Sequence, residues 1–511
     1  MSGSEDLWDI FESSVGAFGD VTALDAGNRT WSYGTLHDQA IAVRQRLCGS
    51  IGLPAVLVVW GQNGADAIVA YLVGTSMGST IVPIDGQLPV ERVMSMLSAL
   101  GGGVILTDRE NELRDRIDGR WSIGTLDGRI DRLGAKSRAG EEPDAAYILF
   151  TSGTTGEPKG VPILGESVRA YVDHVRPIVG MIPGDRHSQN FSLSFDLSVH
   201  DMFITWASGA TLVLREDRSH LLIDVYIRDR QLTHWFSVPS ALTFTTHREH
   251  EPLDTNLRWA GFCGEALTYD QVASVRAWFP NSEIVNLYGP TELTIACSAY
   301  KLPPRVADEV ATSNGTVPIG RVFPHLEWRT AKAEHGDMDF QELLLRGVQR
   351  FKGYVQQESN VKAFRAGDDR TLLGHVRDED WYRTGDVVEI AEGEMLIHHG
   401  RLDDQVKVAG HRIEIADVEE NLRRIDVLGG VAVVVLRSPE ARLEGMATLC
   451  AFYTAPDVDV RIARQSLQER LPAYMIPHDF RHVKSIPLNA NGKIDRAALV
   501  AVCAEPGHSG N

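Results

Sequence analysis

The sequence of 511 residues predicts an α/β protein, with a large N-terminal domain of several α/β subdomains and a small, mobile α+β domain at the C-terminus. Three observations predict this fold class. A strand–helix–strand pattern covers residues 55–84, a similar pattern follows over residues 90–106, and the pattern changes near Gly400.

The first two patterns are typical of parallel β–α–β units. Residues 55–60 and 80–84 are apolar, strand-like runs, and residues 65–77 between them have the apolar spacing of a helix. In the second pattern, the helix-like residues 90–100 are followed by three glycines and the strand-like residues 104–106. The N-terminal part is therefore expected to be α/β.

The C-terminal part has a different order of elements. Residues 400–414 favour a short hairpin that leads into a charged helix beginning near Ile415, and residues 430–436 and 461–470 have the patterns of a buried strand and an amphipathic helix. We predict a large domain over 1–399, a hinge at 400–404, a small domain over 405–500 of ordinary domain size, and a disordered polar tail over 501–511.

Composition argues against several classes of function. The chain is 43% hydrophobic and 23% charged, as is common for soluble globular proteins. Its formal net charge of −19 argues against nucleic acid and anionic membranes as partners, because phosphate binding depends on Lys and Arg. The sequence has no signal-peptide pattern, no apolar run long enough to span a membrane, and five cysteines without a CxxC pair. We expect a cytoplasmic protein with reduced thiols.

Residues 147–161, YILFTSGTTGEPKGV, carry the most informative pattern, an apolar strand that runs into a loop of hydroxyls and glycines. Backbone N–H groups of such a loop can surround phosphate oxygens, hydroxyls add hydrogen bonds, and Lys159 adds positive charge. The loop contains Thr151, Ser152, Gly153, Thr154 and Thr155. It is not a P-loop, because no glycine precedes Lys159. A flexible surface loop is the alternative for residues of these types in arbitrary order.

The order of these residues resembles the phosphate-loop signature of the adenylate-forming enzymes, which include acyl-CoA synthetases, luciferases and the adenylation domains of peptide synthetases. Four further segments resemble motifs of this family in the expected order: NLYGPTE at 286–292, YRTGD at 382–386, GRLDDQVKVAGHRIE at 400–414 and PLNANGKIDR at 487–496. The resemblance spans nearly the whole chain. It implies the adenylate-forming enzyme fold, with ATP and Mg²⁺ as cofactors.

The resemblance also implies roles for individual residues. Tyr288 offers an aromatic face for adenine, and Thr291 and Glu292 supply oxygens suited to phosphate contact and to Mg²⁺. Asp386 can accept hydrogen bonds from both ribose hydroxyls, with Arg401 on the ribose and phosphate side. The other implied nucleotide-binding residues are Gly264, Glu265, Asn286, Leu287, Gly289, Pro290 and His398.

Catalysis in this family is implied to need few residues, because no covalent enzyme intermediate forms. The implied catalytic residues are Thr151, Glu292 and Lys493, and Glu292 is the implied metal ligand. Lys493 could bridge the substrate carboxylate and the α-phosphate in the transition state, whereas an isolated lysine would be a surface charge. Asp403 resembles the pivot of the hinge.

Residues 191–203, FSLSFDLSVHDMF, indicate the branch of the family. Asp196 lies between Phe195 and Leu197, and a carboxylate in apolar surroundings requires a cation. In the amino-acid-activating branch this aspartate pairs with the substrate ammonium, whereas fatty-acid, aryl-acid and luciferin branches do not need it. The alternative is a structural helix cap.

The segment FCGE at 262–265, together with FDLSV, resembles the free-standing D-alanine–carrier protein ligases. The resemblance implies that the substrate is bound by Asp196, Leu197, His200, Ser237, Gly261, Cys263, Leu287, Ile295, Ala296 and Lys493. Leu287 implies a shallow pocket for an alanine-sized side chain. His200 departs from the family's pattern, which leaves open a polar substrate group or a β-amino acid.

The expected reaction is ATP-dependent formation of an aminoacyl-AMP, followed by transfer to the phosphopantetheine thiol of a carrier protein. Few residues follow Lys493, so we expect the carrier to be a separate protein, with coenzyme A as a less favoured acceptor. The pathway would be D-alanylation or natural-product biosynthesis such as antibiotic biosynthesis. Two alternatives stay open: an acyl-CoA synthetase for a non-amino carboxylic acid, and a non-catalytic adenylate-binding protein.

Overall fold

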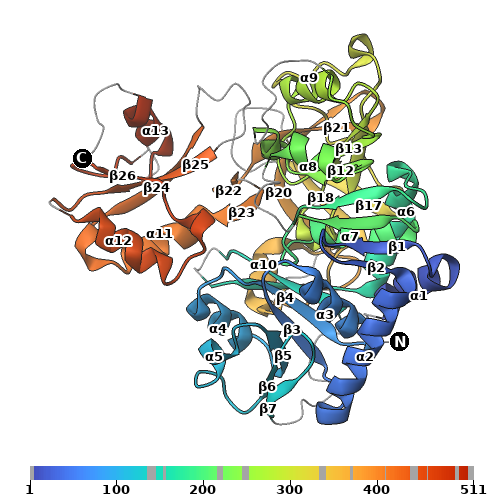
Figure 1. The fold of residues 1–511 in the computed structure, drawn as a ribbon. Helices are drawn as coiled ribbons and strands as arrows, with labels where there is room; N and C mark the ends of the chain where they lie inside the picture. Colours follow the sequence, from blue (N-terminus) through green and yellow to red (C-terminus); the bar gives the residue numbers. More distant parts are fainter. Residues whose placement is uncertain are drawn as a thin grey trace. The chain divides into compact units, whose positions relative to one another are not determined.

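The computed structural model describes residues 5–134, 145–153, 157–215, 222–243, 252–332, 341–368, 372–408, 410–437, 447–456, 458–488 and 494–504. The chain divides into two compact units (Figure 1). The first unit comprises Met1–Gly86, Leu97–Phe150 and Gly160–Leu402, and the second comprises Gln87–Met96, Thr151–Lys159 and Asp403–Asn511. The predicted α/β class is confirmed, since sheets and helices alternate along most of the chain.

The first unit contains a nine-stranded sheet. Its strands, in spatial order, are β16 (Arg321–Val322), β15 (Ser298–Lys301), β14 (Glu283–Tyr288), β13 (Trp259–Phe262), β12 (His234–Ser237), β10 (Arg186–Gln189), β11 (Thr211–Leu214), β1 (Thr22–Asp25) and β2 (Thr30–Ser32). The six strands from β14 to β1 are parallel, and the outer strands pair antiparallel. The carboxyl ends of the parallel strands therefore share one edge.

A seven-stranded sheet contains the predicted β–α–β units. Its strands, in spatial order, are β7 (Ile130–Arg132), β6 (Trp121–Gly124), β5 (Gly103–Thr107), β3 (Val56–Gly61), β4 (Thr80–Asp85), β8 (Tyr147–Thr151) and β9 (Lys159–Ile163). The helix between β3 and β4 is α3 (Ala65–Ser76), and α4 (Val90–Ser98) precedes β5. The strand and helix predictions for residues 55–106 are confirmed. The apolar runs are long because β3, β4 and β5 are buried on both faces.

The first unit also contains a five-stranded sheet. It consists of β17 (Leu326–Lys332), β18 (Gln341–Gly347), β20 (Trp381–Ala391), β19 (Phe364–Arg365) and β21 (Met395–Arg401). The remaining α-helices are α1 (Glu5–Phe18), α2 (Tyr33–Ile51), α5 (Glu110–Leu113), α6 (Gly165–Val179), α7 (Leu197–Ala207), α8 (Ile223–Asp229), α9 (Tyr269–Trp278) and α10 (Asn360–Ala363). Helices α1, α6 and α7 pack on one another around a continuous apolar core.

From Gln405 onward, the described residues of the second unit form a hairpin, a small sheet and several helices (Figure 1). They are β22 (Gln405–Val408), β23 (His411–Glu414), α11 (Ile415–Arg423), β24 (Val431–Arg437), β25 (Ala447–Tyr453), α12 (Val460–Gln468), β26 (Asp479–His482) and α13 (Arg496–Ala504). Val431 and Val433 on one face of β24 pack with α11 and α12. Val434 on the other face packs with Leu499 of α13. The sheet thus has helices on both faces, as the alternation of side chains along β24 requires.

The predicted hairpin, the helix at Ile415 and the elements near 430 and 461 are confirmed. One detail differs. Residues 501–504 belong to α13 and not to a polar tail, because the alanine-rich stretch from Arg496 to Ala504 favours a helix and buries Leu499. The boundaries of the predicted domains and the hinge at 400–404 stay predictions. In the described part of the chain, no helix is both long and apolar enough to cross a bilayer.

Candidate active site

Three neighbouring parallel strands bring several predicted substrate-binding residues to one edge of the nine-stranded sheet. Ser237 is the last residue of β12, Cys263 follows β13, and Leu287 is near the end of β14. The register pairs Ser237 with Phe262 and Phe262 with Asn286, so these positions are level across the sheet. The carboxyl edge of parallel strands is where ligands bind in open α/β sheets.

Helix α7 places Asp196, Leu197 and His200 near this edge. Asp196 occupies the N-cap position of α7 and is buried. Within the described residues, its side chain makes no capping hydrogen bond to the helix. Its charge contributes to the raised pKa values of Tyr147 and Tyr171, which burial raises first. A buried negative charge next to two tyrosines is an environment that favours a bound cation.

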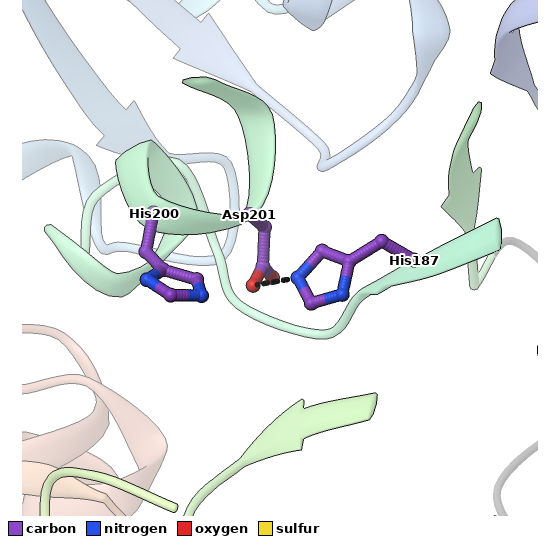
Figure 2. Close-up of side chains that lie close together, drawn as sticks. All are labelled: His187, His200 and Asp201. Carbon is purple, nitrogen blue, oxygen red and sulfur yellow. Dashed lines mark hydrogen bonds and ion pairs between the residues drawn. The ribbon is translucent and has the colours of Figure 1, made fainter. Parts of the chain in front are cut away.

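His200 is fully buried, and one ring nitrogen is engaged. Its Nδ1 lies 2.6 Å from the hydroxyl oxygen of Tyr171. Burial lowers the pKa of His200 to about 3, so the imidazole is neutral at physiological pH. His200 belongs to a buried cluster with Asp201 and His187, in which one ligand atom of each residue lies within 4.8 Å of the others. Figure 2 shows the Asp201 carboxylate between the two rings, with its Oδ1 3.1 Å from Nε2 of His187.

The loop after β14 carries Glu292, Ile295 and Ala296. It begins with a short 3-10 helix, η3 (Thr291–Leu293), and continues through Thr294 and Ile295, whose φ values are +56° and +72°. Positive φ is rare for β-branched residues and requires support from the surroundings.

Gln349 gives the loop that support. Its buried side-chain amide donates to the carbonyl oxygens of Leu293, Thr294 and Ala296 at 3.0, 3.1 and 2.9 Å. The Thr294 hydroxyl donates to the backbone carbonyl oxygen of Gln349 at 2.7 Å. These bonds hold the two residues in the conformation that places Ile295 and Ala296 beside the sheet edge.

Asp386 joins residues from three of the sequence motifs. The Tyr288 hydroxyl donates to Asp386 Oδ2 at 2.6 Å, and Arg401 Nη1 donates to Oδ1 at 2.8 Å. His398 Nε2 lies 3.2 Å from the same Oδ1, and Asp386 faces Arg401 in the pairing of β20 with β21. Burial and the neighbouring Asp386 carboxylate raise the pKa of Tyr288 far above its ordinary value, so its hydroxyl stays a donor. The arrangement places the aromatic ring of Tyr288 beside a carboxylate that can accept hydrogen bonds from the hydroxyl groups of a ligand.

Glu292 is fully buried at the start of the loop. Its Oε1 accepts a 2.6 Å hydrogen bond from the Tyr354 hydroxyl, and its backbone carbonyl accepts from the N–H of Phe351 at 2.9 Å. A single oriented carboxylate suits Mg²⁺, which commonly binds through one or two carboxylates together with substrate phosphates. Glu292 therefore has the chemistry of a magnesium ligand.

Two other predicted nucleotide-binding residues make structural contacts. Asn286 donates its side-chain amide to the carbonyl oxygen of Pro318 at 2.9 Å, and Glu265 accepts from the backbone N–H of Ser240 at 2.9 Å. Both bonds fix loops at the carboxyl edge of the sheet. Gly264 has a φ of +90°. The remaining predicted residues Gly289 and Pro290 lie between β14 and η3, and Thr291 is the first residue of η3.

Part of the predicted phosphate loop belongs to the second unit. There the Ser152 hydroxyl donates to the carbonyl oxygen of Arg412 at 3.0 Å and accepts from the N–H of Glu414 at 3.1 Å. Gly153 is needed for close packing, because a Cβ there would meet the Glu157 carbonyl oxygen and lie 3.2 Å from Lys159. Thr151 ends β8 and Lys159 begins β9. The predicted residues Thr154, Thr155 and Lys493 lie outside the described residues.

Sequence reasoning missed Tyr354, Gln349 and Tyr171, each of which positions a predicted residue. Sequence reasoning also left out Trp259, which is two residues before Gly261 on β13, so the two positions share one face of the strand. No comparable local signal marks Gln349, which is 53 to 56 residues from its partners along the chain.

Comparisons with known proteins agree with the motifs. A family model described as AMP-binding enzyme matches residues 11–355. The Delta-poly-L-ornithine synthetase of Acinetobacter baumannii is 32% identical over 517 residues, which cover 98% of this chain and 37% of that protein. The chain thus spans little more than a third of that relative's length.

Two further matches cover most of both proteins. The D-alanine–D-alanyl carrier protein ligase of Listeria monocytogenes is 30% identical over 471 residues, which cover 87% of this chain and 88% of the ligase. The structure of the Vibrio cholerae adenylation domain AlmE in complex with glycyl-adenosine-5'-phosphate has a TM-score of 0.79 at 24% identity, with 98% of this chain and 97% of AlmE covered. The fold is therefore that of adenylation domains.

Proposed function

The chain belongs to the family of AMP-binding enzymes and is an adenylate-forming enzyme, and from this premise we propose that it activates a small, alanine-like amino acid and passes it to a carrier protein. In the first step a carboxylate oxygen of the amino acid attacks the α-phosphorus of ATP. The bond to the β-phosphate oxygen breaks, which gives aminoacyl-AMP and pyrophosphate. In the second step a pantetheine thiol attacks the carbonyl carbon, AMP leaves, and the thiol proton passes to water.

The observation that carries the amino-acid substrate is Asp196. A carboxylate buried at the N-cap position of α7, beside Tyr147 and Tyr171, is suited to bind the substrate ammonium. A fatty acid or aryl acid would bring no cation to this position. The relatives named above also point to amino acids, since their names refer to ornithine, D-alanine and glycyl adenylate.

We assign the nucleotide to the residues around Asp386 and Glu292. Tyr288 would face the adenine, and Asp386 would accept hydrogen bonds from the ribose hydroxyls while Arg401 orients its carboxylate. Glu292 would hold Mg²⁺, which supplies charge neutralisation for the phosphates when it is bound. Lys493 would stabilise the charge that develops between the carboxylate and the α-phosphate, and Thr151 to Lys159 would hold the departing phosphates.

We propose a separate carrier protein as the acceptor. The carrier protein ligase of Listeria is matched over most of its length, and its name states a carrier protein. The product would serve D-alanylation if the enzyme prefers D-alanine, and natural-product biosynthesis if it prefers an L-amino acid or a β-amino acid.

Amino-acid-dependent ATP–pyrophosphate exchange tests the first step. The panel contains L-alanine, D-alanine, glycine, L-serine, β-alanine, L-phenylalanine, acetate and benzoate. We expect one of the alanines to give the highest rate and the two acids without an amine to give background. A preference for phenylalanine would contradict the small pocket, and a preference for either acid would favour an acyl-CoA synthetase. Absence of exchange with every compound would favour a protein that binds adenylate without turnover.

The second step is tested by thioester formation. The preferred amino acid, ATP and enzyme are incubated either with a phosphopantetheinylated D-alanyl carrier protein or with coenzyme A, and the thioester is measured by intact mass. We expect loading of the carrier protein. Faster formation of aminoacyl-CoA would contradict the proposed acceptor and leave the first step in place.

A further inference from the structure

We propose that Trp259 forms the closed end of the substrate side-chain pocket and that its indole ring limits the enzyme to small amino acids. The inference deepens the proposed amino-acid activation and rests on it. Trp259 is outside the set of substrate-binding residues predicted from the sequence.

The first argument is the position of Trp259 on β13. Side chains alternate along a strand, so Trp259 and Gly261 share one face and Ala260 and Phe262 share the other. A Cβ at Gly261 would lie 2.7 Å from Cζ2 of Trp259 and closer still to Cη2 of the same ring. The six-membered ring of the indole therefore covers the space that a side chain at Gly261 would occupy.

The second argument is that the same indole reaches His200, another predicted substrate-binding residue. The two rings are nearly parallel, at 14° and with centroids 6.2 Å apart. Phe236 lies against both, with centroids 4.2 Å from His200 and 6.1 Å from Trp259. Phe236 pairs with Gly261 in the register of β12 and β13, so it shares their face. Three aromatic rings from α7, β12 and β13 thus lie together on the strand face that carries Gly261.

The third argument is that this group of rings is fixed. Trp259 is 1% exposed and His200 is fully buried. The bond between Tyr171 and His200 orients the His200 ring, and the His187 ring packs near it with centroids 5.8 Å apart (Figure 2). Aromatic rings in fixed positions exclude larger substrate side chains sterically, because additional methylene groups in a closely packed interior force unfavourable shifts of its side chains and backbone.

The indole N–H has no hydrogen-bond partner among the residues that the structure describes. Packing alone therefore holds Trp259 in its position. A phenylalanine at this position keeps an aromatic ring at the base of the side chain but does not extend as far over Gly261, and a leucine opens the space further. The two substitutions form a graded series.

The experiment compares wild type with Trp259→Phe and Trp259→Leu in pyrophosphate exchange with alanine, 2-aminobutyrate, norvaline and leucine. The control is Trp235→Leu. Trp235 is an equally buried tryptophan on the adjacent strand, but it pairs with Ala260 and packs on Phe262, on the opposite face of the sheet. The control therefore loses the same side-chain volume from the core without changing the proposed pocket. Thermal unfolding of each variant is measured in parallel.

We expect the ratio of the leucine rate to the alanine rate to rise about tenfold or more in Trp259→Leu, less in Trp259→Phe, and not at all in Trp235→Leu. Because the comparison uses a ratio of rates, a variant that is partly unfolded still gives a valid result. If Trp259→Leu does not fold, Trp259→Phe decides the outcome with norvaline and 2-aminobutyrate.

An unchanged ratio in a folded Trp259 variant, or an equal change in Trp235→Leu, would overturn the inference while the amino-acid activation stands. Absence of exchange with any amino acid in the wild type would instead overturn the proposed function. Gly261→Ala gives an independent check. Its added methyl group collides with the indole, so it is expected to reduce exchange in the wild-type background and to have a much smaller effect when combined with Trp259→Leu.

Discussion

The carboxylate of Asp196 is buried between Phe195 and Leu197 at the start of α7. Replacement by Asn keeps the shape and removes the charge. We expect Asp196→Asn to slow exchange with the preferred amino acid. The expected loss of transition-state stabilisation is about 2–5 kcal/mol, because the substrate ammonium would be buried without its partner. ATP affinity, measured by calorimetry, is expected to stay near the wild-type value.

Asp224→Asn is the matched control, since Asp224 is another buried aspartate but lies in the first turn of α8. Normal amino-acid activation by Asp196→Asn would show that Asp196 has a structural role only. The amino-acid branch would then lose its main support.

His200 gives a prediction about pH. Burial lowers its pKa to about 3, below the value of about 6.5 in an unfolded chain, so the folded state disfavours the proton. The stability that this difference contributes is complete above the unfolded pKa and is lost as the pH falls from about 6.5 toward 3. At about pH 5 the loss is on the order of 2 kcal/mol in the free energy of unfolding.

We expect His200→Gln to remove this part of the pH dependence, measured by urea unfolding between about pH 7 and pH 5. Glutamine can still accept from Tyr171. The neighbouring His187 and Asp201 and the nearby His234 titrate in both proteins, so the variant keeps some pH dependence. An identical pH slope in the two proteins would show that His200 is not neutral and buried in solution.

Among the elements, the loop from Thr291 to Ala296 depends most on distant residues. Thr294 and Ile295 have positive φ values, which cost about 1–3 kcal/mol each when nothing compensates. We expect Gln349→Met to lower the free energy of unfolding by about 1–3 kcal/mol, because three loop carbonyl groups lose their donor. Exchange activity is expected to fall further than stability alone predicts, since the loop carries Glu292.

Gln341→Met in β18 is a suitable control for this prediction, because the Gln341 side chain accepts a hydrogen bond from the Thr330 hydroxyl of β17 and bonds to no described residue of the loop. Stability is read from urea unfolding, and activity from exchange at saturating ATP. A Gln349→Met enzyme with wild-type activity would show that other contacts hold the loop.

The elements also show which parts of the fold could be predicted from sequence patterns. β3, α3 and β4 match the predicted runs to within one or two residues, because strands buried on both faces give continuous apolar sequences. The motif residues Tyr288, Asp386 and Arg401 could be named from resemblance, but not their mutual contacts, which join residues 98 and 15 positions apart. The spatial order of the nine strands depends on tertiary packing. The spacing of Trp259 and Gly261 is local, but the side-chain orientation that places the indole over Gly261 depends on packing.

At the scale of the whole molecule, the two proposed steps need different groups. The first would need a cation at the α-phosphate, and the second would need access for a thiol. We propose that the C-terminal residues change orientation between the steps, with Asp403 as the pivot. Asp403 is the residue at which the last stretch of the second unit begins, directly after Leu402 of the first.

We expect Asp403→Pro to separate the two steps. Proline fixes φ near −65°, so a pivot that must change its backbone dihedrals is held in one conformation. Pyrophosphate exchange is expected to stay near the wild-type rate. Carrier loading is expected to fall by about 10²-fold or more, because the variant cannot adopt the second conformation. Exchange reports the first step alone, and intact mass of the carrier reports both.

Asp403→Ala is the control, because it removes the side chain, including the acceptor of the 3.3 Å bond from the N–H of Gln405, but leaves the backbone free to rotate. It is expected to support both steps. If Asp403→Pro loads the carrier at the wild-type rate, the pivot lies elsewhere in the chain. If Asp403→Pro and Asp403→Ala lose carrier loading equally, the side chain of Asp403 matters and not the rotation of its backbone, and the two-conformation proposal would need another hinge residue.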